Sequence, residues 1–259
     1  MIKWLEDAVF YEVYPQSFRD SNGDGIGDIP GITEKLEYIQ ELGCNALWIN
    51  PCFTSPFYDA GYDVEDYYSV APRYGTNEDL KKLFEAAHQR GMHVLLDLVP
   101  GHTAVTHPWF QESMKAEKNE YTDRYVWTDS LYKRMEDVKG IVSVLRGISP
   151  RPASCGVNCF STQPALNYGF ANITDAGWQQ PTDAPGPMAT REELKNIMRF
   201  WLTLGCDGFR VDMAGSLVKN DEDKKETIRL WQDVRAFLNK EFPEAVSYTH
   251  LRAHETTLH

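Results

Sequence analysis

Short apolar runs alternate along the chain with longer segments in which apolar residues recur at helical spacing. The apolar runs predict strands at residues 9–14, 46–49, 93–99 and 208–211. The helical patterns occupy residues 32–42, 77–90, 191–204 and 223–241. Because strands that alternate with helices pair in parallel and are covered by those helices, the pattern predicts an α/β fold with a parallel sheet.

The alternation is interrupted between residues 103 and 189. This stretch carries scattered aromatic residues and prolines without a sustained period, and it is too long for an ordinary loop between a strand and a helix. It predicts a subdomain inserted over the mouth of a barrel. The expected organisation is a first half of the barrel over 1–102, the insertion over 103–189 and a continuation of the barrel over 190–246.

The last stretch, residues 247–259, breaks the pattern. It is rich in threonine and histidine and suits no strand after residue 246. The run resembles a translated sequencing adapter joined to a truncated reading frame, with a natural polar tail as the alternative. We therefore expect a non-native tail, which would leave the strand at 208–211 with an exposed edge, leave the first strand unpaired on its outer side and favour aggregation.

Composition and charge narrow the class of function. The 259 residues are 42% apolar, enough for a sizeable core, and the formal net charge is -12. Nucleic acids and anionic membranes require a basic surface, so we expect no nucleic-acid and no membrane partner, and a neutral substrate fits better. No stretch approaches the length of a membrane span, and residues 1–30 lack the apolar core of a signal peptide.

Five cysteines without an export signal predict reduced thiols in a cytoplasmic protein. Cys155 and Cys159 are spaced closely enough to bind one metal ion. Two ligands do not complete a zinc site, however, so a buried thiol or a staple within a loop is the favoured interpretation.

Charged residues end the predicted strand at 208–211. Arg210 and Asp212 share one face of this strand, so both can point into the barrel mouth, where the active sites of such barrels lie. An aspartate held ionised by an adjacent guanidinium is a suitable nucleophile toward an anomeric carbon. The alternative is an arginine–aspartate pair that only closes one layer of the barrel.

A glycine-rich loop near the N-terminus has the spacing of a cation site. Oxygen donors stand at loop positions 1, 3, 5, 7 and 9, where a calcium loop places its ligands, but position 12 is Gly31 instead of the bidentate glutamate of an EF-hand. The predicted ligands are Asp20, Asn22, Asp24, the carbonyl of Ile26, and Asp28. They predict one structural Ca²⁺ or Mg²⁺, with a turn of solvated acids as the alternative.

Several segments resemble, in order, the conserved blocks of the α-amylase superfamily, glycoside hydrolase family 13. They are residues 48–51, 59–63, 97–102 with 107–110, 163–167 and 208–212. The resemblance covers about residues 4–246 and implies the N-terminal part of a (β/α)8 TIM barrel with a subdomain inserted after its third strand. It also implies a glycosidase that acts on α-glucosidic bonds of oligosaccharides or maltodextrins by a retaining double displacement.

The resemblance assigns roles to individual residues. Asp212 is the nucleophile and Arg210 orients it. Asp59, Tyr62 and His102 bind the sugar: Asp59 through hydroxyls, Tyr62 by stacking and His102 by contact with the glucosyl unit whose bond is cleaved. Relatives that resemble oligo-1,6-glucosidases use the loop at residues 20–28 for a structural calcium or magnesium ion.

The family's general acid is a glutamate at the end of the strand after 208–211, so the resemblance places it after residue 246. Glu255 stands in surroundings unlike that block and is not assigned. We therefore expect an incomplete, inactive copy. A transglycosidase or sugar isomerase of the same family, and a sugar-binding remnant without turnover, are the alternatives.

Two positions depart from the family pattern. Gly101 replaces a frequent asparagine beside His102, and Ala165 replaces the usual aspartate of the block at 163–167. Because both changes remove oxygen ligands, we do not expect a calcium ion between the barrel and the insertion.

Overall fold

A five-stranded parallel sheet forms the centre of the protein. The computed structural model describes residues 2–249, and the sheet runs through them in the order β1-β2-β5-β8-β9. Its strands are β1 (Phe10–Val13), β2 (Ala46–Ile49), β5 (His93–Leu98), β8 (Gly208–Val211) and β9 (Val246–Thr249). Neighbours follow the chain order and pair in parallel, as in a (β/α) barrel. The four predicted strands are confirmed with ends shifted by at most one residue.

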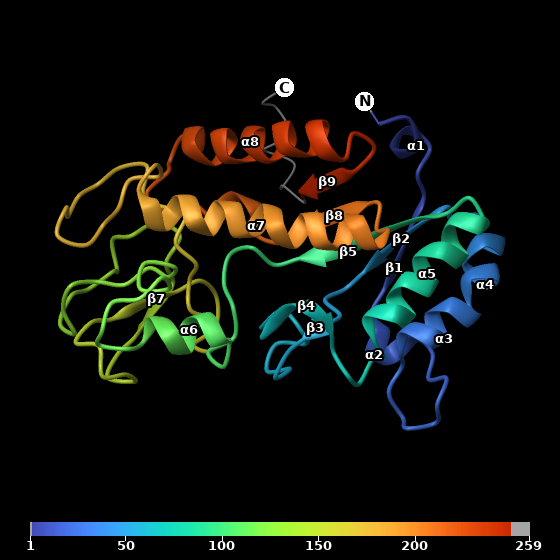
Figure 1. Ribbon diagram of the computed structural model, residues 1–259, viewed down its shortest axis with the longest axis horizontal. Coiled ribbons are helices and arrows are strands. Elements are labelled where there is room, and N and C mark those ends of the chain that lie inside the picture. Colours follow the sequence, from blue (N-terminus) through green and yellow to red (C-terminus); the bar gives the residue numbers. More distant parts are fainter. Residues whose placement is uncertain (1, 250–259) are drawn as a thin grey trace.

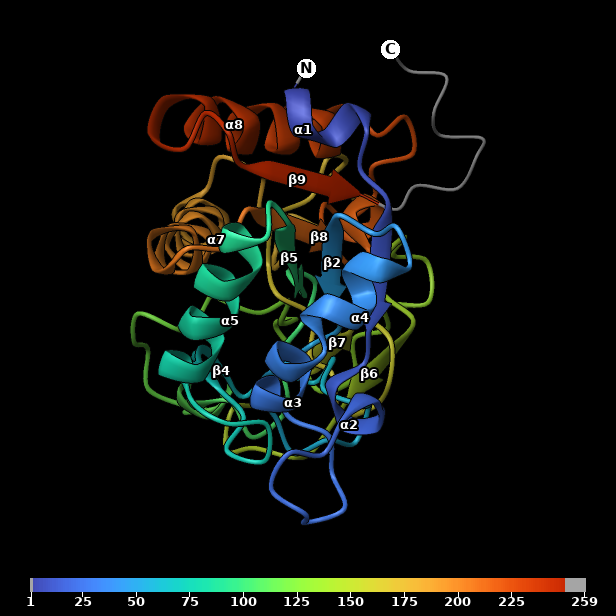
Figure 2. The same ribbon diagram turned by 90° about the vertical axis from the view of Figure 1, so that its right-hand side faces the viewer.

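The longer helices accompany the sheet, and Figure 2 shows α8, α7 and α5 following one side of it. The helices are α1 (Lys3–Glu6), α2 (Pro15–Phe18), α3 (Ile29–Glu34), α4 (Leu36–Glu41), α5 (Asn77–Gln89), α6 (Pro108–Ser113), α7 (Pro185–Leu204) and α8 (Lys225–Glu241). The helix predicted over 32–42 is divided, because Lys35 between α3 and α4 has φ -105° and ψ 7°. The helix predicted from residue 191 already begins at Pro185, since proline in the first turn needs no partner for an N–H.

The strand β9 corrects one expectation. Residues from 247 onward were expected to form no strand, yet Val246–Thr249 pairs with Gly208–Val211 along its whole length. Valine, tyrosine and threonine favour strands, and Gly208 lets β9 approach: a Cβ there would lie 2.1 Å from the Val246 carbonyl oxygen. The edge of β8 is therefore covered, while β1 lies at the end of the strand order as expected. That 247–259 is non-native stays a prediction, and residues 250–259 lie outside the described part.

The core extends from the sheet into the loops that follow the strands. Trp201 on α7 is fully buried, stacks on Phe53 with 5.1 Å between ring centroids and donates its Nε1–H to the Tyr67 carbonyl at 2.7 Å. Phe53 and Tyr67 belong to a short antiparallel pair, β3 (Phe53–Thr54) and β4 (Asp66–Val70). Because its donor is paired, this indole is buried without leaving a polar group unsatisfied.

The segment between β5 and α7 has little regular structure. It contains α6 and one antiparallel pair, β6 (Ser143–Leu145) with β7 (Cys155–Val157). Figure 1 shows it gathered at one end of the molecule, away from α3, α4 and α5. Phe110, Tyr125 and Trp127 bury their side chains in the same core as the sheet, so this segment shares one core with the strands. The outer limits of an insertion at 103 and 189 stay a prediction.

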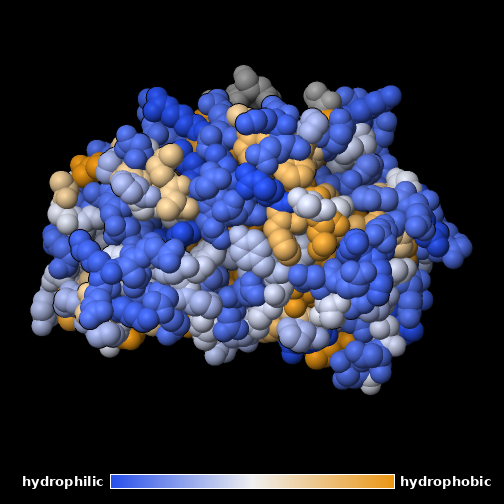
Figure 3. All heavy atoms as spheres, viewed as in Figure 1, coloured by the Kyte–Doolittle hydropathy of each residue, from blue (hydrophilic) through white to orange (hydrophobic). Residues whose placement is uncertain are grey.

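The outer surface is mainly hydrophilic on the face that Figure 3 shows, with apolar side chains gathered near its centre. Among large apolar side chains, α7 exposes Met188 and Phe200, and α8 exposes Ile228. Within residues 2–249, no helix is both long and apolar enough to cross a membrane.

The five cysteines are all unpaired. Cys155 is buried in β7 and Cys159 is exposed, so the staple considered from their spacing is not present. In the described part of the chain, no three histidine, cysteine, aspartate or glutamate side chains converge to hold a metal ion.

Candidate active site

The site lies at the carboxyl ends of β5 and β8. Their register pairs Asp97 of β5 with Arg210 of β8, and Asp212 follows directly after β8. Because side chains two residues apart on a strand point to the same side, Arg210 and Asp212 face the same region. Two neighbouring strands thus bring two carboxylates and one guanidinium together.

Arg210 bridges the two carboxylates. Its Nη1 lies 3.0 Å from Oδ1 of Asp212 and 3.0 Å from both carboxylate oxygens of Asp97. The guanidinium carbon also lies 4.9 Å from the centre of the Trp48 ring, whose Nε1–H donates to Asp97 at 3.0 Å. Three groups from β2, β5 and β8 therefore fix the orientation of Asp212.

The two carboxylates differ in access. Asp97 has a fully buried side chain, whereas the side chain of Asp212 is 16% exposed. Burial raises the pKa of Asp212, the Arg210 guanidinium opposes this rise and the charge of Asp59 adds to it. Oδ1 of Asp212 accepts from Arg210, and no hydrogen bond from residues 2–247 reaches its Oδ2. This oxygen is the one that can attack a substrate atom.

Asp59 stands in a strained loop. The buried carboxylate of Asp63 accepts hydrogen bonds from Ser55 Oγ at 3.0 Å and from the backbone N–H of Asp59 at 3.1 Å. Phe57 and Ala60 have φ of 60° and 53°, a left-handed conformation that non-glycine residues rarely adopt and that often occurs at functional sites. The local fold thus favours one placement of Asp59.

The segment after β5 also holds Asp59. Gln163 donates its side-chain N–H to Oδ2 of Asp59 at 2.6 Å. Burial raises the pKa of Asp59, while this hydrogen bond lowers it. Residues 104 positions apart in the chain therefore meet at this carboxylate.

Tyr62 connects the Asp59 loop to the carboxylate cluster. Its hydroxyl donates to Oδ2 of Asp97 at 3.3 Å and accepts from the Asn50 amide at 3.3 Å. Burial, and then the charge of Asp97, raise the pKa of this phenol above its usual value, so it stays a neutral donor. The hydroxyl is held inside the protein, which leaves the ring as the part of Tyr62 suited to stack on a sugar.

His102 has both ring nitrogens engaged within the protein. Nε2 lies 3.0 Å from the Tyr62 carbonyl oxygen and Nδ1 lies 3.0 Å from Nδ2 of Asn158. The residue is 2% exposed, and burial lowers the pKa of its imidazole to about 4. His102 is therefore a neutral link behind Tyr62, and direct contact with a glucosyl unit stays a prediction.

The structure thus links all five predicted site residues: Arg210 bonds Asp212, and the Tyr62 N–H donates to the Asp59 carbonyl at 2.8 Å. Tyr62 joins them through Asp97, and His102 joins through the backbone of Tyr62. Asp59 reaches Asp212 through its charge. Their catalytic and sugar-binding roles remain predictions.

Several residues of this hydrogen-bond network are not among those predicted from the sequence. Trp48, Asp97 and Gln163 stand inside the family-like blocks, so those blocks contained a signal for them. Asn158 and Lys219, which bond each other behind the site, carried no signal, because nothing in their local sequence shows which distant residue they approach.

The predicted cation loop is held by its own side chains. Asp20 Oδ1 accepts from the backbone N–H of Asn22 and Gly23, at 3.1 and 2.6 Å, and the Asn22 amide oxygen accepts from the N–H of Asp24 at 2.9 Å. Backbone N–H groups, first of all that of Gly25, lower the pKa of Asp20. The loop is thereby closed by bonds between its own side chains and backbone.

Asp28, at the end of the same loop, has a structural role of its own. Its Oδ1 accepts from the backbone N–H of Gly31 at 2.7 Å, which caps α3, and its Oδ2 accepts from Ser21 Oγ at 2.8 Å. A ninth-position ligand often reaches the cation through water. The donor types are those of a divalent-cation site, but within the described residues the three carboxylates do not converge, and the ligand roles stay predictions.

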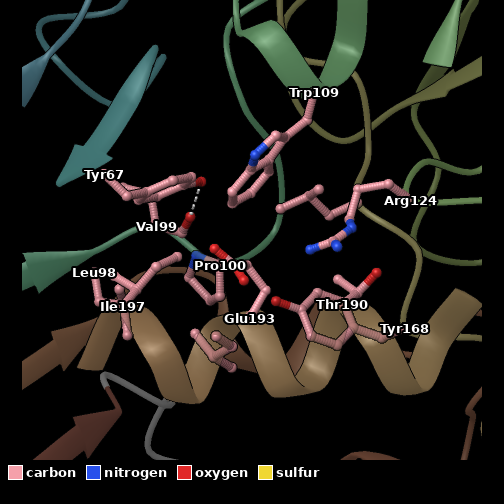
Figure 4. Close-up of a pocket in the computed structure, with 12 residues that line it drawn as sticks. Tyr67, Leu98, Val99, Pro100, Trp109, Arg124, Tyr168, Thr190, Glu193 and Ile197 are labelled. Carbon is pink, nitrogen blue, oxygen red and sulfur yellow. Dashed lines mark hydrogen bonds between the residues drawn. The ribbon is translucent and has the colours of Figure 1, made fainter. Parts of the chain in front are cut away.

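A small cavity lies beside the candidate active site, between β5 and α7. Figure 4 shows Tyr67, Trp109, Arg124 and Glu193 around it, with the Tyr67 hydroxyl donating to the Val99 carbonyl at 2.8 Å. Its volume of about 10 Å³ has room for one water molecule at most. It is a packing gap between α7 and the segment after β5, and it is too small for a sugar.

Comparison with known proteins identifies the family and the relatives that this chain resembles. Residues 12–256 match the family described as alpha amylase, catalytic domain. The oligo-1,6-glucosidase of Bacillus sp. (strain F5) is 38% identical over 219 residues, which are 85% of this chain and 40% of that relative. The trehalose synthase/amylase TreS of Mycolicibacterium smegmatis is 40% identical over 253 residues, which are 94% of this chain and 40% of that relative.

Solved structures agree with these matches. A family GH13_31 enzyme superposes with a TM-score of 0.81 at 28% identity, covering 95% of this chain and 47% of the other. The trehalulose synthase MutB from Pseudomonas mesoacidophila MX-45 superposes with a TM-score of 0.78 at 32% identity, covering 95% of this chain and 45% of the other. The parallel sheet is therefore part of a TIM barrel, and the chain spans less than half the length of these relatives.

Proposed function

This chain belongs to the α-amylase catalytic-domain family, and we propose that it supplies the nucleophile of a site that acts on α-glucosidic bonds of gluco-oligosaccharides or maltodextrins. One observation carries the proposal: Arg210 fixes Oδ1 of the partly exposed Asp212 and leaves Oδ2 free within the described residues. The neutral substrate agrees with the net charge of -12. A cytoplasmic location is proposed from the five unpaired thiols.

The proposed mechanism is a retaining double displacement. Oδ2 of Asp212 attacks the anomeric carbon, the bond to the leaving oxygen breaks, and a glycosyl ester forms on Asp212. Water then breaks that ester, and Asp212 returns to its carboxylate form. Arg210 assists the second step, because its positive charge stabilises the carboxylate that is released.

The reaction also needs a second carboxyl about 5 to 5.5 Å from the nucleophile, which protonates the leaving oxygen. Asp97 cannot serve, since its side chain is fully buried and bonded to Arg210 and Trp48. Asp59 is bonded to Gln163 and is assigned by resemblance to sugar hydroxyls. The strand β9, which precedes the acid in the family order, ends at Thr249.

We therefore predict that a polypeptide of these 259 residues alone shows no measurable glycosidase activity. General acid catalysis contributes about 10² to 10⁴ in rate, and the described residues supply no suitable acid. The measurement is release of nitrophenol from a nitrophenyl α-glucoside. The control is the same polypeptide extended after residue 246 with the corresponding segment of a family member, which is expected to restore turnover. Cleavage by the 259-residue polypeptide that depends on Asp212 would contradict the prediction.

A second candidate is transfer to another sugar instead of water. The relatives named trehalose synthase and trehalulose synthase favour it. It uses the same glycosyl ester but excludes water from the second step. Product analysis of the extended polypeptide separates the two: glucose from maltose or isomaltose indicates hydrolysis, while a new disaccharide from maltose or sucrose indicates transfer. Binding of maltose without any product would favour a sugar-binding remnant.

We also propose that the loop at residues 20–28 binds one structural Ca²⁺ or Mg²⁺ through Asp20, Asn22, Asp24, the Ile26 carbonyl and Asp28. A cation that binds only the folded state raises stability by about 2.7 kcal/mol at a hundredfold excess over Kd. We therefore expect a higher Tm when calcium or magnesium is added to chelator-treated protein. Asp24→Asn should reduce the increase, whereas Asp223→Asn, at an exposed site outside the loop, should not. An unchanged Tm in the unsubstituted protein would refute the site.

A further inference from the structure

Lys219 is buried behind the site and has no carboxylate partner. The residue is 0% exposed, and no ion pair within residues 2–249 involves it. Its ammonium donates to the Ser216 carbonyl at 2.7 Å and lies 3.5 Å from Oδ1 of Asn158. A buried charge without a counter-ion is costly, so the position of this lysine requires an explanation beyond packing.

A continuous chain of contacts leads from Lys219 to the Asp59 loop. The amide of Asn158 lies between Lys219 and His102, with Nδ2 at 3.0 Å from His102 Nδ1. Nε2 of His102 lies 3.0 Å from the Tyr62 carbonyl oxygen. These residues come from the segments after β8, β7, β5 and β3, so the series of contacts crosses the whole site.

The direction of donation along this series of hydrogen bonds is determined at both ends. Oδ1 of Asn158 faces Lys219 and can only accept, so the lysine donates whether or not it is protonated, and Nδ2 of Asn158 then donates to Nδ1 of His102. A carbonyl can only accept, so the proton of His102 must be on Nε2 to reach Tyr62. Both ends therefore agree with the same tautomer.

Gly101 makes room for Asn158. A Cβ at residue 101 would lie 2.6 Å from Nδ2 of Asn158, closer than side chains tolerate. The glycine that departs from the family pattern beside His102 therefore allows an amide from the segment after β7 to reach the histidine.

We infer that Lys219, Asn158 and His102 form a positioning unit that fixes one histidine tautomer and thereby holds the Tyr62 backbone at the sugar-binding loop. The inference rests on the proposed function only in naming what Tyr62 binds. None of the three residues needs to touch the reacting atoms, so each acts through the next.

The pKa shifts of Lys219 and His102 agree with this arrangement. Burial lowers the pKa of Lys219 to about 7, and the charge of Lys224 adds to that effect. Burial lowers the pKa of His102 to about 4; the Tyr62 carbonyl and Asp63 oppose this, and Lys219 contributes to it. A protonated His102 would place an N–H against the Asn158 amide donor, so the network favours the neutral ring.

The test reads the His102 tautomer directly. In the 259-residue protein labelled with ¹⁵N-histidine, long-range ¹H–¹⁵N spectra should show Nδ1 unprotonated and Nε2 protonated, with the signal identified by its loss in His102→Asn. Asn158→Asp should abolish this pattern, because a carboxylate cannot donate to Nδ1 and favours a protonated Nδ1. Lys219→Met should give a mixture of tautomers, since Asn158 then loses the donor that fixes its orientation.

The control is Asn167→Asp, a buried asparagine of the same segment whose amide bonds the Asp123 carbonyl and Gln180 instead. It should leave the His102 signals unchanged. A protonated Nδ1 in the unsubstituted protein would overturn the inference even if no variant folds. An unchanged tautomer in folded Asn158→Asp would do the same.

Sugar binding separates this inference from the proposed function. By calorimetry, Asn158→Asp should weaken maltose binding about tenfold, the size expected for the loss of one hydrogen bond. If the unsubstituted protein binds no maltose, the proposed substrate class fails, while the tautomer measurement still decides whether the positioning unit exists.

Discussion

Replacing Asp212 with asparagine is expected to lower kcat by at least about 10⁴-fold in any form of this protein that turns over an α-glucoside. An amide oxygen does not form the glycosyl ester, so the first step of the double displacement is lost. The amide oxygen of asparagine can still accept the hydrogen bond from Arg210. We therefore expect the fold and the binding of oligosaccharide to be retained.

The measurement combines steady-state kinetics on a nitrophenyl α-glucoside with calorimetric binding of maltose. Asp223→Asn is the matched control, because it makes the same chemical change at a side chain that is 71% exposed and paired with Lys225. It should change kcat less than twofold. A variant Asp212→Asn that keeps a tenth of the activity would exclude Asp212 as the nucleophile.

Replacing Arg210 with methionine is expected to destabilise the protein by about 3 to 5 kcal/mol. Asp97 is fully buried and accepts two hydrogen bonds from Arg210. Without the guanidinium, Asp97 and Asp212 are left as neighbouring carboxylates with no cation between them. One of them must then take up a proton or remain buried with an unpaired charge, and both cost free energy.

Urea denaturation measures this effect as a lower transition midpoint. Arg199→Met is the control, because Arg199 pairs with Glu241 at a partly exposed surface where such pairs contribute less than about 1 kcal/mol. Adding Asp97→Asn to Arg210→Met should recover part of the lost stability, since it removes the fully buried charge. Equal stability losses for Arg199→Met and Arg210→Met would contradict the role assigned to Arg210.

The strands of the sheet could be predicted because their signal is local. Buried parallel strands are continuous apolar runs, and 46–49 and 208–211 reappear unchanged as β2 and β8. The strand β9 was missed because a run of serine, tyrosine and threonine is polar by composition. Its pairing depends on Gly208, which is distant in the sequence but adjacent in the sheet.

The site residues that belong to one strand or follow it directly could be predicted from the sequence. Residues 210 and 212 face the same side because of the period of two, which any strand imposes. The family-like blocks supplied Asp59, Tyr62 and His102 as further candidates. By itself, then, the sequence determined the fold class, the family and the position of the candidate nucleophile.

Only the tertiary structure decided what holds these groups in place. Asn158 meets His102 across 56 residues and Lys219 across 61, and Gln163 meets Asp59 across 104. A hydrogen bond is directional and requires both partners within about 3 Å, so local sequence cannot specify which distant residue completes it. The packing of the segment after β5 onto the barrel strands brings these partners together.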